Sequence, residues 1–220
     1  EGRGKAVLRC FKSPINVLIM IAIVDYRAGN VTSVQLAFKA LHAETVVTSD
    51  AAVIRAASHV VFPGVGAAGA AMQNLRDLGL IPVLKEVAAS GVPFLGICLG
   101  TQILLSSSEE DGGTPTLDLI PGRVPRFVPT SPCDKVPQIG WNQVHFVRSH
   151  PVVKNIADNS DFYFVHSYYP APADPVFSIG TTDYAGITFT SMMGRDNLVA
   201  TQFHPEKSGR VGLKLLENFV

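Results

Sequence analysis

Cys98 lies between two glycines in the run "GICLG" (96–100), and this spacing suits a nucleophile. The preceding "VPFL" predicts a strand and the following "LGTQILLSSS" predicts a helix, so Cys98 falls at a strand-to-helix turn. A sharp turn that exposes a nucleophile at the end of a strand leaves room only for glycine two residues to either side. The helix N-terminus would favour thiolate over thiol. A small buried cysteine explains the same run equally well.

A base for such a nucleophile is available near the C-terminus, in "ATQFHPEKSG" (200–209). His204 and Glu206 are two residues apart, and on an extended segment their side chains point the same way. Pro205 stiffens this segment because it fixes φ. Glu206 can orient one imidazole nitrogen and leave the other for Cys98, which is the arrangement of nucleophile, base and orienting carboxylate. The alternative, a surface histidine beside a solvated glutamate, does not account for Cys98.

Acyl transfer also requires hydrogen-bond donors for a developing oxyanion. The glycine-rich run "FPGVG" (62–66) ends an apolar stretch and precedes a predicted helix. The predicted oxyanion donors are the backbone N–H groups of Gly64, Val65, Gly66 and Leu99. The run taken alone is better explained as a plain βα turn. Because sites in open α/β sheets lie at the carboxyl ends of strands, we expect this run and Cys98 to share one sheet edge.

The elements that must position these groups alternate in the first half of the chain. Buried strands are predicted for four apolar runs: 17–24, 44–48, 59–62 and 93–97. Helices are predicted over 31–42 and 71–90, with Gly91 as the stop of the second. Strand–helix–strand units of this kind indicate a parallel sheet with helices on both faces.

The second half, from residue 122 onward, shows short strands separated by turn residues, with "GRDN" (194–197) as a hairpin turn. A final amphipathic helix is predicted up to residue 219, with Ser208 as its cap. The predicted fold class is therefore α/β, a mixed and mainly parallel open sheet flanked by helices, with an antiparallel second half.

The composition limits the classes of partner. Lys+Arg and Asp+Glu balance at 18 each in 220 residues, so no global field favours nucleic acid or an anionic membrane. Cys10, Cys98 and Cys133 are odd in number and widely spaced, which excludes a disulfide framework and a zinc site. We therefore expect a reducing, cytoplasmic location, no bound metal and no cofactor.

The N-terminal residues combine four basic side chains with the apolar run 17–24, as a signal peptide does. No small-x-small cleavage site follows, and the run is too short to span a bilayer. A buried strand is the better interpretation. We therefore expect residues 1–19 to be an extension of unknown role, with Met20 as a plausible start of a single domain over 20–220.

The motifs "GICLGTQ" and "QFHPEKS" resemble those of class I glutamine amidotransferases, a family with a Cys-His-Glu triad. The resemblance covers essentially residues 20–220. A subfamily, the glutaminase subunits of imidazole glycerol phosphate synthase, is indicated by further stretches: "VDYRAGNVTSVQLAF" (24–38), "FPGVG", "GWNQV" (140–144) and "FVHSYY" (164–169). The implied fold is flavodoxin-like.

The resemblance implies a reaction and a set of roles. Cys98 attacks the side-chain amide of glutamine, His204 passes a proton to the leaving ammonia, and Glu206 orients His204. Water then hydrolyses the γ-glutamyl thioester to glutamate. The residues implied in the glutamine pocket are Gln102, Glu110, His166 and Ser167.

The resemblance also implies a partner, a (β/α)₈ cyclase subunit that forms a heterodimer with this chain. Ammonia passes to the cyclase, which makes imidazole glycerol phosphate and an aminoimidazole carboxamide ribonucleotide in histidine biosynthesis. Asn30, Trp141 and Lys207 are implied near the interface, although a core tryptophan in the turn-like "IGWNQ" is equally compatible. The alternative is the glutaminase subunit of an anthranilate or GMP synthase type, which Val65 disfavours.

Overall fold

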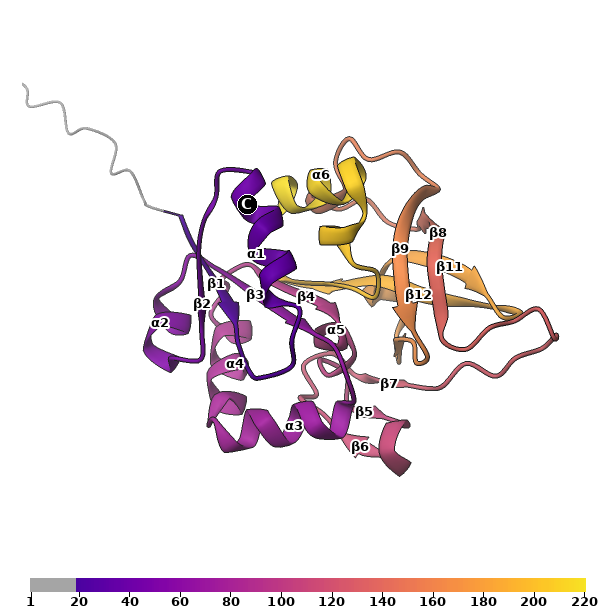
Figure 1. Cartoon of the computed structure of the whole chain (residues 1–220), viewed down its shortest axis with the longest axis horizontal. Coiled ribbons are helices and arrows are strands. Elements are labelled where there is room, and N and C mark those ends of the chain that lie inside the picture. The colour runs from indigo at the N-terminus through magenta and orange to yellow at the C-terminus, as the bar shows by residue number, and fades with distance from the viewer. Residues whose placement is uncertain (1–18) are drawn as a thin grey trace, which may run out of the picture.

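The computed structural model describes residues 19–220, so the expected N-terminal extension lies outside the described residues except for Ile19. The chain builds a nine-stranded sheet that runs through the middle of the molecule (Figure 1). Five neighbouring strands are parallel, in the spatial order β2 (Glu44–Thr48), β1 (Met20–Val24), β3 (His59–Gly64), β4 (Phe94–Cys98) and β13 (Leu198–Thr201). The sheet continues with four antiparallel strands, in the order β12 (Ile187–Arg195), β11 (Ser178–Tyr184), β8 (Gln138–Phe146) and β9 (Ser160–His166).

A small second sheet lies beside the parallel half. Its four short strands follow the order β10 (Ala171–Pro172), β7 (Gly122–Val124), β5 (Ser107–Ser108) and β6 (Thr114–Pro115). The predicted fold class, a mainly parallel open sheet with an antiparallel second half, is confirmed.

Helices cover both faces of the large sheet (Figure 1). One face packs against α1 (Val31–Ala40) and α6 (Gly209–Phe219), the other against α2 (Ala51–Ala56), α3 (Ala68–Asp77) and α4 (Leu80–Ala89). Because it is covered on both faces, β4 is buried along its whole length, which explains its continuous apolar run. The remaining helical segments are short: α5 (Leu99–Gln102), η1 (Glu110–Gly112), η2 (Pro151–Val153), η3 (Pro175–Phe177) and η4 (Pro205–Lys207).

Several predicted elements differ from the structure. The single helix predicted over 71–90 is wrong, because Gly79 adopts φ 64° and separates α3 from α4. The helix α2 was not predicted, since its six residues are too few for a clear periodicity, although Asp50 caps it by accepting from the N–H groups of Ala52 and Val53. The helix expected after Cys98 is also shorter than predicted, for α5 ends at Gln102.

Two further expectations near the C-terminal half are corrected. Trp141 lies inside the strand β8 and not in a turn, and its side chain is 57% exposed. Ser208 precedes α6 but makes no side-chain cap, because its hydroxyl donates to the carbonyl of His204 and accepts from the N–H of Tyr163. Among residues 19–220, every helix falls short of the length and apolar character that crossing a membrane demands.

Candidate active site

Cys98 occupies a strained corner at the carboxyl end of β4. Its φ of 55° and ψ of −110° are rare for a residue with a side chain, and it is 7% exposed. Steric crowding requires glycine at the two flanking positions, 96 and 100, as the spacing predicted. A Cβ on Gly96 would lie 2.9 Å from the side chain of Leu104, and one on Gly100 would lie 1.8 Å from the backbone oxygen of Phe62. The strained φ, ψ of a cysteine at a sheet edge is typical of a functional residue.

His204 and Glu206 meet beside this corner. His204 Nδ1 and Glu206 Oε1 are 2.7 Å apart, and both side chains are fully buried. The segment is not extended as predicted, because Pro205 begins the 3₁₀ turn η4 directly after His204. The side chains still meet, since one turn of a 3₁₀ helix folds the carboxylate back towards the imidazole.

The charges at this pair fix its protonation. Burial alone would lower the pKa of His204, but the negative charges of Cys98 and Glu206 raise it to about 10. Burial would raise the pKa of Glu206, yet the hydrogen bond and charge of His204 hold that pKa below its usual range. At neutral pH the pair is therefore an imidazolium and a carboxylate.

The free nitrogen of His204 remains available for proton transfer. His204 Nε2 is buried and has no hydrogen-bond partner among the described residues. The Cys98 sulfur instead accepts a long hydrogen bond of 3.7 Å from the side-chain amide of Gln202 and lies 4.0 Å from the carbonyl oxygen of Val165. The influence of Cys98 on the pKa of His204 shows that the sulfur and the imidazole share one electrostatic environment.

A cavity of about 270 Å³ opens above Cys98. It is lined by Val65, Gly66, Cys98, Leu99, Gln102, Glu110, Pro137, Val165, His166, Ser167 and Tyr168. All four residues expected in a glutamine pocket thus lie around the predicted nucleophile.

The polar groups of this cavity are held by the backbone around it. The Gln102 amide donates to the carbonyl of Tyr168 and to the side chain of Gln202, both at 2.9 Å. Glu110 accepts from the N–H of Ala68 at 2.7 Å, while burial raises the pKa of its carboxyl. The cavity therefore presents a carboxylate and a fixed amide.

His166 is held neutral in the cavity wall. Burial lowers the pKa of His166 to about 4. Its Nδ1 lies 2.7 Å from the carbonyl oxygen of Tyr168, and since that oxygen can only accept, Nδ1 carries the proton. The two histidines near Cys98 thus differ in charge, because only His204 has a carboxylate partner.

The predicted oxyanion donors are only partly available in this structure. Gly66 and Leu99 line the cavity, and Gly64 is paired with Cys98 in the β3–β4 register. The N–H of Val65, however, donates to the carbonyl of Ala28 at 2.9 Å. It is therefore occupied by the loop that precedes α1.

The residues expected near a partner contact Glu206 or the ring of Tyr163. Trp141 packs edge-on against Tyr163 with ring centroids 6.1 Å apart, and the Lys207 ammonium lies 6.0 Å from the same ring. Asn30 is half-buried, and its amide donates to Glu206 Oε1 at 2.7 Å. The motifs did not predict this contact or the position of Tyr26 against Gly64, because both depend on how the β1–α1 loop packs on distant segments.

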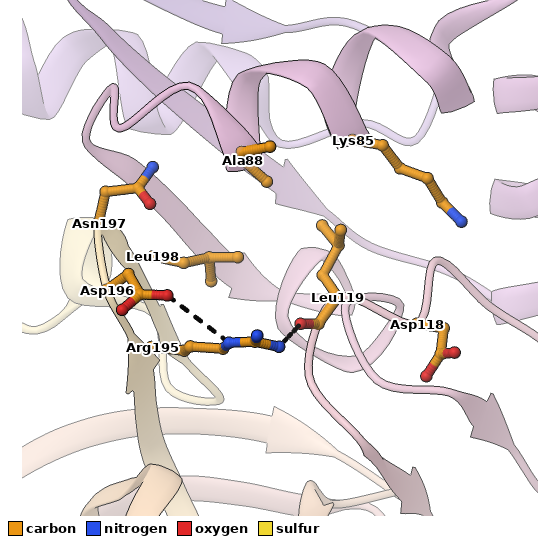
Figure 2. A pocket seen from close by; sticks show the side chains of 9 residues that line it. Lys85, Ala88, Asp118, Leu119, Arg195, Asp196, Asn197 and Leu198 are labelled. Carbon is orange, nitrogen blue, oxygen red and sulfur yellow. Dashed lines mark hydrogen bonds and ion pairs between the residues drawn. The ribbon is translucent and has the colours of Figure 1, made fainter.

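Another pocket of about 270 Å³ lies at the opposite end of the sheet, between α4 and the β12–β13 turn (Figure 2). Arg195 there pairs with Asp196 at 3.6 Å and donates to the carbonyl of Leu119 at 3.2 Å. None of its lining residues is a cysteine, serine, threonine or histidine, so it lacks the thiol and imidazole found at the carboxyl end of β4. Among residues 19–220, no group of three His, Cys, Asp or Glu side chains could hold a metal ion.

Comparison with known proteins identifies the family. A family model described as glutamine amidotransferase class-I matches residues 22–220. The chain belongs to the class I glutamine amidotransferases. The resemblance that the motifs indicated is thereby confirmed, and its two motifs contain Cys98 and the buried His204–Glu206 pair described above.

Curated relatives of this amidotransferase carry a more specific name. "Imidazole glycerol phosphate synthase subunit HisH" of Chloroflexus aurantiacus is 51% identical over 204 residues, which are 91% of this chain and 95% of the relative. The subunit HisH of Moorella thermoacetica is 50% identical over 199 residues, or 90% and 93% of the two chains. Within its family the amidotransferase thus groups with HisH subunits.

Solved structures with lower identity share the fold. The structure of PurLQS from Thermotoga maritima superposes with a TM-score of 0.70 at 14% identity, covering 91% of this chain and 96% of that chain. A structure described as a glutamine amidotransferase gives a TM-score of 0.66 at 16% identity, covering 90% and 99%. The class I amidotransferase fold is therefore shared well beyond the HisH relatives.

Proposed function

We propose that this chain is the glutaminase subunit of imidazole glycerol phosphate synthase and supplies ammonia for histidine biosynthesis. The observation that carries the proposal is the geometry around Cys98, with a buried imidazolium–carboxylate pair beside a strained thiol. The HisH relatives at about half identity support the choice of synthase. Residues 20–220 would form one amidotransferase domain.

The chemistry follows from the charges of the triad. The Cys98 sulfur adds to the side-chain carbonyl carbon of glutamine, and the carbonyl electrons move onto the oxygen. The tetrahedral intermediate collapses with loss of the C–N bond, while His204 Nε2 donates a proton to the leaving nitrogen and releases ammonia. Neutral His204 then takes a proton from water, whose oxygen displaces the sulfur and gives glutamate. Glu206 keeps the imidazole oriented and stabilises its charged form.

Glutamine binding uses the groups that line the cavity. Glu110 supplies a negative charge for the substrate α-ammonium, and Gln102 with the backbone of Gly66, His166 and Ser167 supplies hydrogen bonds. The cavity volume of about 270 Å³ is just below the range of about 300–1,000 Å³ typical of small-molecule pockets, which suits a ligand as small as one amino acid.

A partner subunit completes the reaction. We propose a (β/α)₈ cyclase that binds beside Asn30, Trp141 and Lys207 as a heterodimer, in the cytoplasm, with no role for nucleic acid. The partner would have a second role, which is to activate the glutaminase. The N–H of Val65 donates to the carbonyl of Ala28, and this hydrogen bond must break before the N–H can stabilise an oxyanion. Binding of the liganded cyclase would favour that rearrangement.

The proposal is tested by glutamine hydrolysis with and without the cyclase and its nucleotide substrate. We expect strong activation by the liganded cyclase and complete loss in Cys98→Ala. A matched control is Cys133→Ala, which removes the exposed cysteine and should keep the activity. Full hydrolysis by Cys98→Ala, or equal rates with and without liganded cyclase, would refute the mechanism. Activation by an anthranilate or GMP synthase subunit instead would show that the chain supplies ammonia to that synthase.

A further inference from the structure

Asn30 occupies the position before α1 but does not cap the helix. Asparagine at this position usually accepts a hydrogen bond from an N–H of the first turn. Here the side chain makes no such bond. Its amide instead donates to Glu206 Oε1 at 2.7 Å, and its nitrogen lies 3.4 Å from His204 Nδ1. The side chain has thus been diverted from the helix to the triad.

We propose that Asn30 is a positioning residue of the triad, whose amide fixes the Glu206 carboxylate in the place from which it orients His204. This inference rests on the proposed glutaminase function. It assigns Asn30 a part in the hydrolysis of glutamine that is separate from any contact with the cyclase.

The surroundings of Glu206 explain why a second donor is needed. The Glu206 side chain is fully buried, so bulk water does not solvate its charge. Its Oε1 receives hydrogen bonds from His204 and Asn30, and its Oε2 is buried without a partner among the described residues. The torsion that turns a carboxylate has broad minima. Without Asn30, only the hydrogen bond from His204 would hold the plane of the Glu206 carboxylate. The carboxylate would then be positioned by the same imidazole that it has to orient.

The backbone at this position explains why the residue is asparagine. Asn30 adopts φ 64°, in the left-handed region that few residues other than glycine and asparagine adopt readily. Glycine would fit this backbone but has no amide. Glutamine would bring an amide but favours another backbone conformation. Asparagine meets both requirements.

The role of Asn30 is separable from substrate binding. Asn30 does not line the cavity above Cys98. Its loss should therefore lower kcat with little change in the KM for glutamine. A residue that merely supports the local fold would affect both constants, because it would distort the cavity wall.

The test uses the full chain at saturating liganded cyclase. Asn30→Gly keeps the left-handed backbone and removes the amide, so we expect kcat to fall about 10- to 100-fold, the effect of one hydrogen bond to a charged group, with KM within about twofold. Asn155→Gly is the matched control, since Asn155 is exposed, has φ 60° and has no side-chain hydrogen bond among the described residues. Its kcat should equal that of the wild type.

A second variant keeps the inference testable if Asn30→Gly folds poorly. Asn30→Asp preserves size and left-handed backbone but sets a carboxylate against Glu206, so its kcat should fall further. Wild-type kcat in either folded variant would overturn the inference. So would a variant that only weakens cyclase affinity and recovers full kcat at saturation, because Asn30 would then act solely at the interface. An inactive wild-type complex would instead refute the proposed function itself.

Discussion

Tyr26 is a buried residue whose hydroxyl has no hydrogen-bond partner among the described residues. It is 1% exposed, and burial together with the nearby charge of Cys98 raises the pKa of its phenol, which stays protonated. The hydroxyl lies directly over Gly64, where a Cβ would come within 2.0 Å of it. A polar group in this state reduces the stability of the free chain.

We therefore expect Tyr26→Phe to stabilise the free chain by about 1–2 kcal/mol, because the substitution removes an unsatisfied hydroxyl and keeps the ring packing against Phe62. Thermal unfolding should show a rise of about 2–8 °C for a chain of this length. Tyr184→Phe is the control, since the Tyr184 hydroxyl donates to the carbonyl of Lys135 at 2.7 Å. That variant should not gain stability, and a loss in Tyr26→Phe would show that its hydroxyl is satisfied.

The triad could be predicted from residue types, but its supports could not. As their motifs indicated, Cys98 ends β4 and His204 pairs with Glu206 at 2.7 Å, because each motif sits at a point where the chain pattern changes from strand to turn. The contacts of Asn30 and Tyr26 carry no such signal. They depend on a left-handed backbone in one loop and on a glycine in another, and neither is visible until the segments are packed.

At the scale of elements, α5 is packed so closely against β3 that a side chain in place of Gly100 would clash with the strand. A Cβ on Gly100 would lie 1.8 Å from the backbone oxygen of Phe62, which cannot move without displacing the strand. Thr101 fixes the helix from the other side by donating to the carbonyl of Thr201 at 2.6 Å. The strand-to-helix turn at Cys98 is thus held between β3 and β13.

Gly100→Ala should therefore destabilise the chain by about 1–3 kcal/mol, the usual cost of overpacking, although alanine is the better helix former. Denaturant unfolding of the full chain measures the change. Gly69→Ala in α3 is the comparison, because its Cβ would come within 3 Å only of the end of the Asp111 side chain. That end can swing away, with loss of its 3.3 Å hydrogen bond from the Gly69 N–H. We expect that variant to be neutral or slightly stabilised, and equal destabilisation of both would exclude the steric explanation.

The elements themselves differed in how well the sequence predicted them. The strand β2 was predicted at its observed bounds, since a β-branched run between turn residues has one interpretation. The helices α3 and α4 were merged, because leucines on both sides of Gly79 continue the apolar pattern across the break. The packing of helices on a twisted sheet decides where such breaks occur. Hydrophobic periodicity in the sequence does not show these breaks.

At the scale of the whole molecule, an exposed aromatic residue packs against Tyr163, whose carbonyl accepts from the N–H of His204 at 2.9 Å. Trp141 is 57% exposed on β8, beside Tyr163 and the ammonium of Lys207. Large exposed aromatic side chains are enriched at the centres of protein interfaces. The position of Trp141 therefore suits contact with a partner subunit that activates the hydrolysis of glutamine.

Trp141→Ala should weaken binding of the cyclase by about 2–4 kcal/mol and leave the thermal stability of the free chain nearly unchanged, since the side chain is mostly exposed. Titration calorimetry with the cyclase measures the affinity. Val176→Ala provides the control, because Val176 has the same exposure of 57% but lies in η3. Equal affinities of the two variants for the cyclase would place the interface elsewhere.

The position of β13 has a consequence for how the enzyme comes into being. This strand is the last of the chain, yet it lies between β4 and β12 in the interior of the sheet. Until it has been synthesised, the parallel and antiparallel halves have no strand to join them, and the thiol made more than a hundred residues earlier lacks His204. A nascent or prematurely ended chain therefore carries the sulfur without its base, so it cannot consume glutamine before the fold is complete.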